Sequence, residues 1–278
     1  MHAAELPPLS DREFRGFREV IYRETGIQIS EHKRELLTAR LSRRVRSLGM
    51  RRFGEYLMAI ERDPPERVEM LDRIVTNETR FFREPGQFAF LETTVLPRWR
   101  ADAQRAARPK RVRVWSAGCS TGQEPYSIAM TLLAQLEGWE IEILASDISG
   151  RALRQAMAGL WPIEKASEIP DEYRQTFMLK GVRTQSGKML AGERLRSVIR
   201  FQRINLHEEL PDVGIFDLVF CRNVLIYFDV ESRTKAVTRL LSRLAPSGYL
   251  FLGHSESLLR SGMRVRPVSP SVYTRASR

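Results

Sequence analysis

A glycine-rich loop, Gly118-Cys119-Ser120-Thr121-Gly122, stands between a predicted strand and a predicted helix. Residues 112–117 suit a buried strand, and Pro125 favours the first turn of a helix. Because glycine lets the backbone turn tightly and approach a ligand closely, this arrangement predicts a site for a nucleotide-like cofactor. The same five residues also have the Gly-x-Ser-x-Gly spacing of a hydrolase nucleophile elbow, with Ser120 as the nucleophile.

A hydrolase would need an acid and then a histidine downstream of Ser120, and Asp217 and His254 occur in that order. Its nucleophile would also follow several earlier strands, one of which supplies part of the oxyanion hole. Here the strand before the loop is the first one predicted, because helical periodicity fills the preceding residues. The order of elements therefore favours the cofactor loop over the hydrolase.

An acidic residue, Asp147, ends the second predicted strand in the run Ala145-Ser146-Asp147-Ile148. An acid at this place typically binds the ribose hydroxyls of a nucleotide cofactor. Asp147 could also cap the helix predicted to begin near Ser149. The glycine loop does not fit the G-x-G-x-x-G pattern of redox dinucleotides, so a nucleoside without a pyrophosphate is favoured.

From residue 111 the pattern alternates between strands and helices, which predicts an α/β domain with a doubly wound, mostly parallel sheet. The predicted strands are 112–117, 141–146, 216–221 and 249–253, and the predicted helices are about 124–136, 149–158 and 231–244. Between about 177 and 203, three short segments broken by glycines predict a small antiparallel β insertion.

The first 76 residues are predicted to form an all-α N-terminal domain. Ser10 and Glu13 make a capping-box pattern at its start. The four helices are expected from Ser10 to Gly26, from a Ser30 cap to Gly49, around Tyr56–Ile60 and from Pro64. Residues 77–110 are expected to be a linker with a connecting helix, leaving 111–278 as the α/β domain.

The chain carries 45 Lys and Arg residues against 34 Asp and Glu residues, a formal net charge of +11. This excess predicts an anionic partner, and charge alone does not choose among nucleic acid, an acidic membrane and an acidic protein. In and around the second helix, eight basic residues are opposed only by Glu35: Lys33, Arg34, Arg40, Arg43, Arg44, Arg46, Arg51 and Arg52. This basic face is either a solvated surface or a docking surface for an acidic helix or a phosphate backbone.

The two cysteines, Cys119 and Cys221, are not arranged as a metal-binding pair and are predicted to be free thiols, with no metal site expected. The N-terminal residues lack the plan of a signal peptide, and no apolar run approaches the about 20 residues that span a bilayer. A cytoplasmic location is therefore expected.

Four motifs in order resemble those of the chemotaxis receptor methyltransferase (CheR) family. They are Thr76-Asn77-Glu78-Thr79-Arg80-Phe81-Phe82-Arg83-Glu84, the loop from Gly118 to Ser127, Ala145-Ser146-Asp147-Ile148, and Phe220-Cys221-Arg222-Asn223-Val224-Leu225-Ile226-Tyr227-Phe228. The resemblance covers nearly the whole chain. One departure is Gln123, where relatives often have a second acid before Glu124.

The resemblance implies a Rossmann-like class I methyltransferase sheet and S-adenosylmethionine (SAM) as cofactor. It implies an enzyme that esterifies glutamate side chains on chemoreceptors. The cofactor would be contacted by Asn77, Thr79, Arg83, Glu124, Asp147, Asn205, Leu206, Arg222 and Asn223. The implied partners are acidic receptor helices docked on the N-terminal domain and, at the β insertion, a receptor tail peptide.

The chemistry of such a reaction agrees with the residue types present. A glutamate with a pKa of about 4.3 is already an anion at neutral pH, so methyl transfer needs alignment more than a general base. Arg83 could fork onto a carboxylate and Tyr227 could donate a hydrogen bond near the methyl group, which makes them the catalytic candidates. His254 is expected to be a structural residue at the end of a strand.

Two other functions fit part of the pattern. A nucleic-acid methyltransferase would explain the positive charge. Amino methylation of adenine usually shows an Asp/Asn-Pro-Pro-aromatic tetrad, however, and Cys221-Arg222-Asn223-Val224 stands in its place. A catalytically silent scaffold that binds SAM is the second alternative, which the intact Arg83, Asp147 and Tyr227 disfavour.

Overall fold

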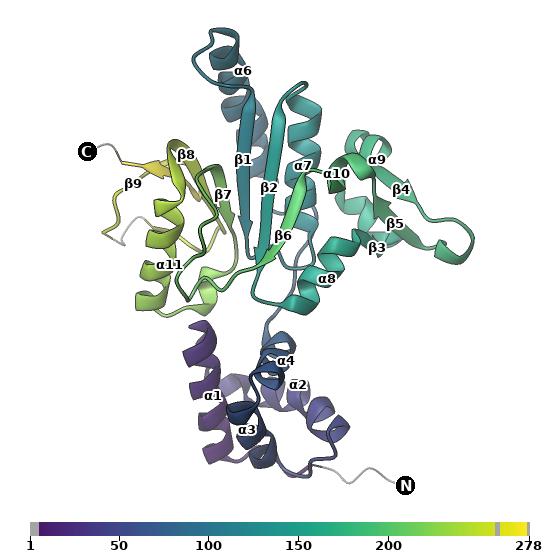
Figure 1. The fold of residues 1–278 in the computed structure, drawn as a ribbon, viewed down its shortest axis with the longest axis vertical. Coiled ribbons are helices and arrows are strands. Elements are labelled where there is room, and N and C mark those ends of the chain that lie inside the picture. Colours follow the sequence, from purple (N-terminus) through teal and green to yellow (C-terminus); the bar gives the residue numbers. More distant parts are fainter. Residues whose placement is uncertain (1–5, 259–261, 277–278) are drawn as a thin grey trace. The chain divides into compact units, whose positions relative to one another are not determined.

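A computed structural model describes residues 6–258 and 262–276, and its chain divides into two compact units. The helical unit comprises the residues up to Thr76 together with Tyr227–Ser232. The α/β unit comprises Asn77–Ile226 and the residues from Arg233 onward. Each unit is described by itself below (Figure 1).

The helical unit has the helices that the sequence predicts: α1 (Asp11–Thr25), α2 (Arg34–Ser47), α3 (Phe53–Arg62) and α4 (Pro64–Ile74). The Ser10–Glu13 capping box is formed, and Gly26 ends α1 in the left-handed region at φ 70°. Ser30 instead precedes a short 3-10 turn, Glu31–Lys33, and its side chain makes no cap hydrogen bond. The apolar faces of the helices meet in one core that includes fully buried Phe17.

Two arginines of the basic face bind partners within this unit. Arg44 donates through Nε to Glu66 Oε1 at 2.8 Å and through its terminal nitrogen to the other carboxylate oxygen, and the Tyr56 hydroxyl donates to Oε1 at 2.8 Å. The Arg44 hydrogen bonds hold the pKa of the Glu66 carboxyl below its usual value. Arg40 donates to the Ile74 carbonyl and, at 3.2 Å, to the Thr76 hydroxyl. Both arginines therefore have structural partners that their spacing in the sequence did not show.

The α/β unit is built on a seven-stranded sheet in the order β6-β2-β1-β7-β8-β10-β9 (Figure 1). Its strands are β1 (Arg111–Ala117), β2 (Glu140–Asp147), β6 (Ile199–Arg203), β7 (Phe216–Cys221), β8 (Leu244–Leu252), β9 (Val265–Ser269) and β10 (Val272–Arg275). The first five strands of that order run parallel, and β10 is antiparallel to both β8 and β9. The predicted α/β class with a mostly parallel sheet is confirmed, and the closing β9–β10 hairpin is additional to the prediction.

Helices and short turns accompany this sheet and the small sheet described below. They are α5 (Pro85–Phe90), a π-helical turn (Leu91–Val95), α6 (Leu96–Gln104), α7 (Gln123–Gln135), α8 (Gly150–Ala158), α9 (Asp171–Phe177), α10 (Glu193–Arg196) and α11 (Val230–Ser242), with 3-10 turns at Ile163–Glu168, Arg183–Gln185 and Leu225–Tyr227. α7 and α8 both pack against β2 and β6. Within the described residues, no helix is long and apolar enough to cross a bilayer.

The small antiparallel sheet differs from the prediction in its third strand. It has the order β3 (Leu160–Pro162), β5 (Lys188–Ala191) and β4 (Met178–Lys180). Residues 199–203, predicted as part of the insertion, instead form β6, which pairs in parallel with β2. The buried side chain of Ile199 and the free edge of β2 explain this placement, because the edge of the main sheet offers both backbone partners and apolar contact.

Candidate functional site

The glycine loop leaves β1 and closes against the end of β2. The backbone N–H groups of Gly118 and Cys119 both donate to the Ser146 carbonyl, at 2.7 and 2.8 Å. Gly118 has φ 90°, and a Cβ there would lie 2.3 Å from Cγ2 of Val224. Any other residue type would strain this backbone conformation and displace the Val224 side chain, so the glycine loop packs closely against the segment that follows β7.

Asp147 fixes the same loop from the end of β2. Its carboxylate accepts hydrogen bonds from the backbone N–H groups of Ser120, at 2.8 Å, and Ser149, at 2.9 Å. The N-cap of α8 is Ser149, whose hydroxyl accepts from Ala152 N at 3.1 Å. Asp147 therefore does not cap the helix itself, and this residue, 9% exposed, lies at the strand end where a ribose would be bound.

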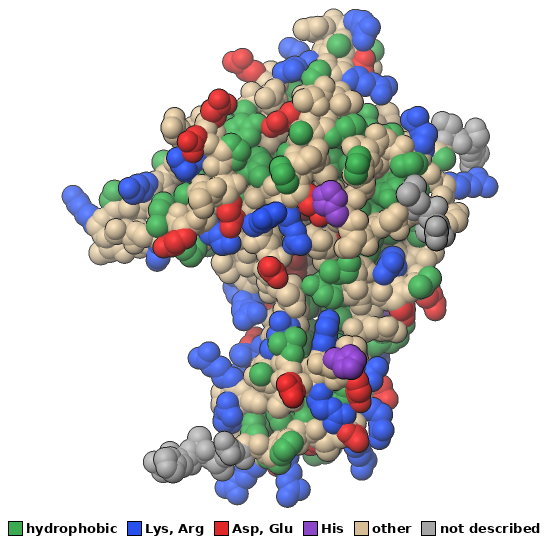
Figure 2. All heavy atoms as spheres, turned by 180° about the vertical axis from the view of Figure 1, so that it is seen from behind, with side chains coloured by type: hydrophobic (Ala, Val, Ile, Leu, Met, Phe, Trp, Pro, Cys, Tyr) green, Lys and Arg blue, Asp and Glu red, His purple; other side chains and the backbone are tan. Residues whose placement is uncertain are grey.

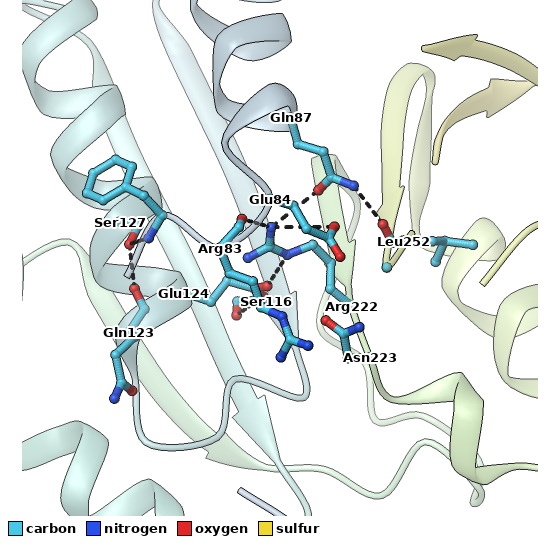
Figure 3. Close-up of polar contacts among 12 residues, drawn as sticks. Arg83, Glu84, Gln87, Ser116, Gln123, Glu124, Ser127, Arg222, Asn223 and Leu252 are labelled. Carbon is cyan, nitrogen blue, oxygen red and sulfur yellow. Dashed lines mark hydrogen bonds and ion pairs between the residues drawn. The ribbon is translucent and has the colours of Figure 1, made fainter. Parts of the chain in front are cut away.

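A buried ion pair joins β7 to the start of α7 (Figure 3). Arg222 Nε donates to Glu124 Oε2 at 2.6 Å, and the Ser116 hydroxyl of β1 donates to the other oxygen at 2.6 Å. The Arg222 side chain is 2% exposed and that of Glu124 is 8% exposed. Glu84 Oε2 stands 3.9 Å from the same guanidinium. Glu124 and Arg222, both expected to line the cofactor, thus bind each other.

The Arg222 guanidinium also holds the segment that carries Arg83. It donates to the Arg83 carbonyl and, at 3.4 Å, to Gln87 Oε1, while Gln87 Nε2 donates to the Leu252 carbonyl at 2.7 Å (Figure 3). Phe82 N donates to the Ser127 hydroxyl of α7 at 3.0 Å. The backbone around Arg83 is therefore held by hydrogen bonds to Arg222, which follows β7, and to α7.

The Arg83 side chain itself is only partly buried. Its guanidinium donates to the Glu78 carbonyl at 3.4 Å, and in Figure 3 it points away from the Arg222–Glu124 pair. A fixed backbone with an outward cationic head suits a residue that binds a carboxylate.

Asn223 follows Arg222 in the left-handed region at φ 59°. Its backbone N–H donates to Glu256 at 2.7 Å, whereas its side-chain oxygen Oδ1 is buried without a hydrogen-bond partner within the protein. A buried amide oxygen without a donor is unfavourable, so a ligand with N–H or O–H groups fits this position. SAM carries an ammonium group, hydroxyls and an adenine amine, and the residues present are compatible with it.

The other predicted contacts lie in two further loops, one before α5 and one after β6. The Asn77 carbonyl accepts from the Ser120 hydroxyl at 3.0 Å, which joins that segment to the glycine loop, and Thr79 is partly buried nearby in the chain. Asn205 Nδ2 donates to Glu208 at 2.8 Å, and Leu206 is buried in the loop after β6. Tyr227 belongs to the helical unit, where its carbonyl accepts from Gln28 N at 3.0 Å.

The hydrolase arrangement is absent from the described residues. The Ser120 hydroxyl donates to the Asn77 carbonyl, and Asp217, near the start of β7, accepts from Arg108 at 2.7 Å and from Arg113 N at 2.9 Å. His254 follows the end of β8, where its backbone N–H donates to the Glu84 carboxylate at 3.1 Å. Asp217 and His254 thus lie at opposite ends of parallel strands, so they cannot serve the same serine.

Several residues of this network were missed in the sequence: Glu84, Gln87, Ser116, Ser127 and Glu256. Each is a polar residue that is buried. Ser116 and Ser127 interrupt apolar runs, and a polar residue inside such a run indicates a buried hydrogen bond. The predicted free thiols are confirmed, and burial raises the pKa of both Cys119 and Cys221. Gln123 is buried and accepts from the Thr121 hydroxyl at 2.8 Å.

A doubly wound sheet with a glycine loop after β1 and an acid after β2 defines a nucleoside-cofactor α/β protein of the methyltransferase class. Residues 77–273 match the CheR methyltransferase SAM binding domain, and residues 12–75 match the CheR methyltransferase all-alpha domain. The chain therefore belongs to the CheR methyltransferase family. The resemblance seen in the sequence and SAM as the cofactor are confirmed.

Curated relatives are similar over nearly their full length. A chemotaxis protein methyltransferase 2 of Pseudomonas aeruginosa is 39% identical over 95% of this chain and 93% of its own length. The chemotaxis protein methyltransferase of Escherichia coli is 37% identical over 98% and 94%. That of Borreliella burgdorferi is 34% identical over 92% and 91%.

Proposed function

We propose that this protein transfers a methyl group from SAM to glutamate side chains of chemoreceptors and so forms glutamyl methyl esters. The observation that carries the proposal is the match to the SAM binding domain over residues 77–273, which includes every proposed cofactor contact. When bound, SAM supplies an electrophilic methyl group on a sulfonium. An ionised glutamate can attack it directly, so the protein's part is to align the two.

Within this proposal the named residues divide into two kinds. Asn77, Thr79, Asp147, Asn205 and Asn223 present polar groups on loops, while Leu206 adds an apolar contact. Glu124 and Arg222 act mainly through each other, because their charged groups are buried and paired. Arg83 and Tyr227 are proposed to position the reacting carboxylate and the methyl group.

The proposed partner is an acidic helical region of a receptor, which implies a cytoplasmic location. The basic face in and around α2 supports this docking, and we propose that its exposed side chains make the contacts. Lys33, Arg43, Arg46, Arg51 and Arg52 are exposed, whereas Arg40 and Arg44 have internal partners. Blue side chains project over the surface of the helical unit in Figure 2. A receptor tail peptide is proposed at β4, an edge strand of the small sheet.

The test of the proposed reaction is incubation with methyl-labelled SAM and a cytoplasmic receptor fragment, followed by base treatment. A glutamyl methyl ester releases labelled methanol under these conditions. A methylated nucleobase retains its label, so the same assay run with RNA or DNA in place of the receptor tests that alternative. A receptor fragment that yields no volatile label would refute glutamate methylation.

Reversal of charge at the exposed arginines is expected to weaken receptor binding. The double variant Arg43→Glu/Arg46→Glu should raise the KM for the receptor fragment about tenfold at low salt, with kcat nearly unchanged, because long-range attraction between exposed charges is lost. The effect should shrink at high salt. Steady-state methylation at two ionic strengths measures it.

The matched control is Arg12→Glu/Arg15→Glu, which makes the same change of charge at exposed positions of α1. If both double variants raise the KM equally, net charge and not the α2 face is responsible, and the docking surface is wrong.

A further inference from the structure

Glu256 is a buried carboxylate that joins two loops of the α/β unit. It lies in the loop after β8 and is 2% exposed. Its Oε2 accepts from the backbone N–H groups of Asn223 and Gly253, both at 2.7 Å, and its Oε1 accepts from Ile226 N at 3.1 Å. Burial raises the pKa of this carboxyl, although the N–H donors act in the opposite direction. A carboxylate so placed is a rigid clamp between the loops after β7 and β8.

The clamp acts on a residue in an unusual conformation. Asn223 has φ 59°, in the left-handed region that most residues with a side chain avoid and that asparagine adopts more readily than most. Its Oδ1 is the buried oxygen that lacks a protein partner. The next residue, Val224, fills the space beside Gly118. The backbone held by Glu256 thus carries the Asn223 side chain and sets its direction.

We propose that Glu256 is a positioning residue of the SAM site, which acts by aiming the Asn223 side chain at the cofactor. This inference rests on the proposed function, because it assumes that Asn223 contacts SAM. Glu256 itself takes no part in methyl transfer. Its contribution is to hold Asn223 ready before the cofactor arrives, so that binding does not have to order the loop.

Glu256→Gln tests this role, because the amide retains the size of the carboxylate but places an N–H₂ group against at least one backbone N–H donor. SAM affinity is measured by calorimetry on the full chain, for Glu256→Gln alone and in an Asn223→Gly background. Glycine removes the side chain but keeps the left-handed conformation accessible. We expect the Kd for SAM to rise about tenfold in the native background and less than about twofold in the Asn223→Gly background.

A residue that only stabilises the fold would lower the unfolding temperature but show the same effect on Kd in both backgrounds. Equal fold-changes, or no change in either background, would overturn the inference. A native protein that binds no SAM would refute the proposed function as well. If the native protein binds SAM but Glu256→Gln changes the Kd by the same factor in both backgrounds, only the role of Glu256 is refuted.

Gly253→Ala decides the matter if Glu256→Gln does not fold. A Cβ at Gly253 would lie 2.7 Å from Glu256 Oε2, 2.8 Å from Asn223 Nδ2 and 2.9 Å from Asn223 N, so it disturbs Asn223 both through the clamp and by direct contact. It should weaken SAM binding and lose that effect in the Asn223→Gly background. Gly86→Ala, where a Cβ meets nothing within 4 Å, is the control and should bind SAM like the native protein. Gly253→Ala with native affinity would overturn the inference.

Discussion

Replacement of Arg222 by Met is expected to destabilise the α/β unit by about 3–5 kcal/mol. Methionine fills much of the same space, but it leaves the buried carboxylates of Glu124 and Glu84 without their cation. It also removes the donors to the Arg83 carbonyl and to Gln87. Urea unfolding followed by tryptophan fluorescence measures the loss, because all four tryptophans (Trp99, Trp115, Trp139 and Trp161) lie in this unit.

Two further variants make the Arg222 prediction specific. Arg222→Met/Glu124→Gln should recover part of the lost stability, because the uncompensated charge next to Ser116 is then gone. Arg243→Met removes an arginine from the same unit whose partner Asp212 is 89% exposed, and it should cost no more than about 1 kcal/mol. If Arg222→Met lowers the free energy of unfolding no more than Arg243→Met does, the buried ion pair does not stabilise the fold.

The elements with local signals could be predicted from the sequence. The Ser10–Glu13 box and Gly26 define α1 through contacts within a few residues, and the glycine loop after β1 needs φ values that few other residues adopt. Ile199–Arg203 misled the prediction because its apolar and polar residues alternate. An edge strand of a parallel sheet and a strand of an antiparallel hairpin share that pattern, and only the pairing with β2 separates them.

The candidate site was predictable as a set of loops but not as a network. The ends of β1, β2 and β7 must meet at one edge of a parallel sheet, which places Gly118, Asp147 and Asn223 together. The pairing of Arg222 with Glu124 joins residues 98 positions apart. Nothing local distinguishes an arginine that binds a ligand from one that binds a buried glutamate, so the sequence assigned both residues to the cofactor.

Replacement of Arg83 by Ala is expected to reduce methyl transfer at least about tenfold, equivalent to about 1.4 kcal/mol of transition-state stabilisation, without unfolding the protein. The backbone at this position is held through its carbonyl by Arg222, and that contact survives the substitution. What is lost is a partly exposed guanidinium that donates a long hydrogen bond, of 3.4 Å, to the Glu78 carbonyl. Steady-state methylation of a receptor fragment, with a thermal melt of each variant, measures both effects.

Arg80→Ala is the matched control for Arg83→Ala, because Arg80 is an exposed arginine three positions earlier in the same segment. It should retain nearly native activity. Whether Arg83→Ala changes kcat or the KM for SAM then shows how the guanidinium acts. A fall in kcat places it on the reacting groups in the transition state, whereas a rise in the KM for SAM alone makes it a cofactor contact. Native rates in Arg83→Ala would remove Arg83 from the site.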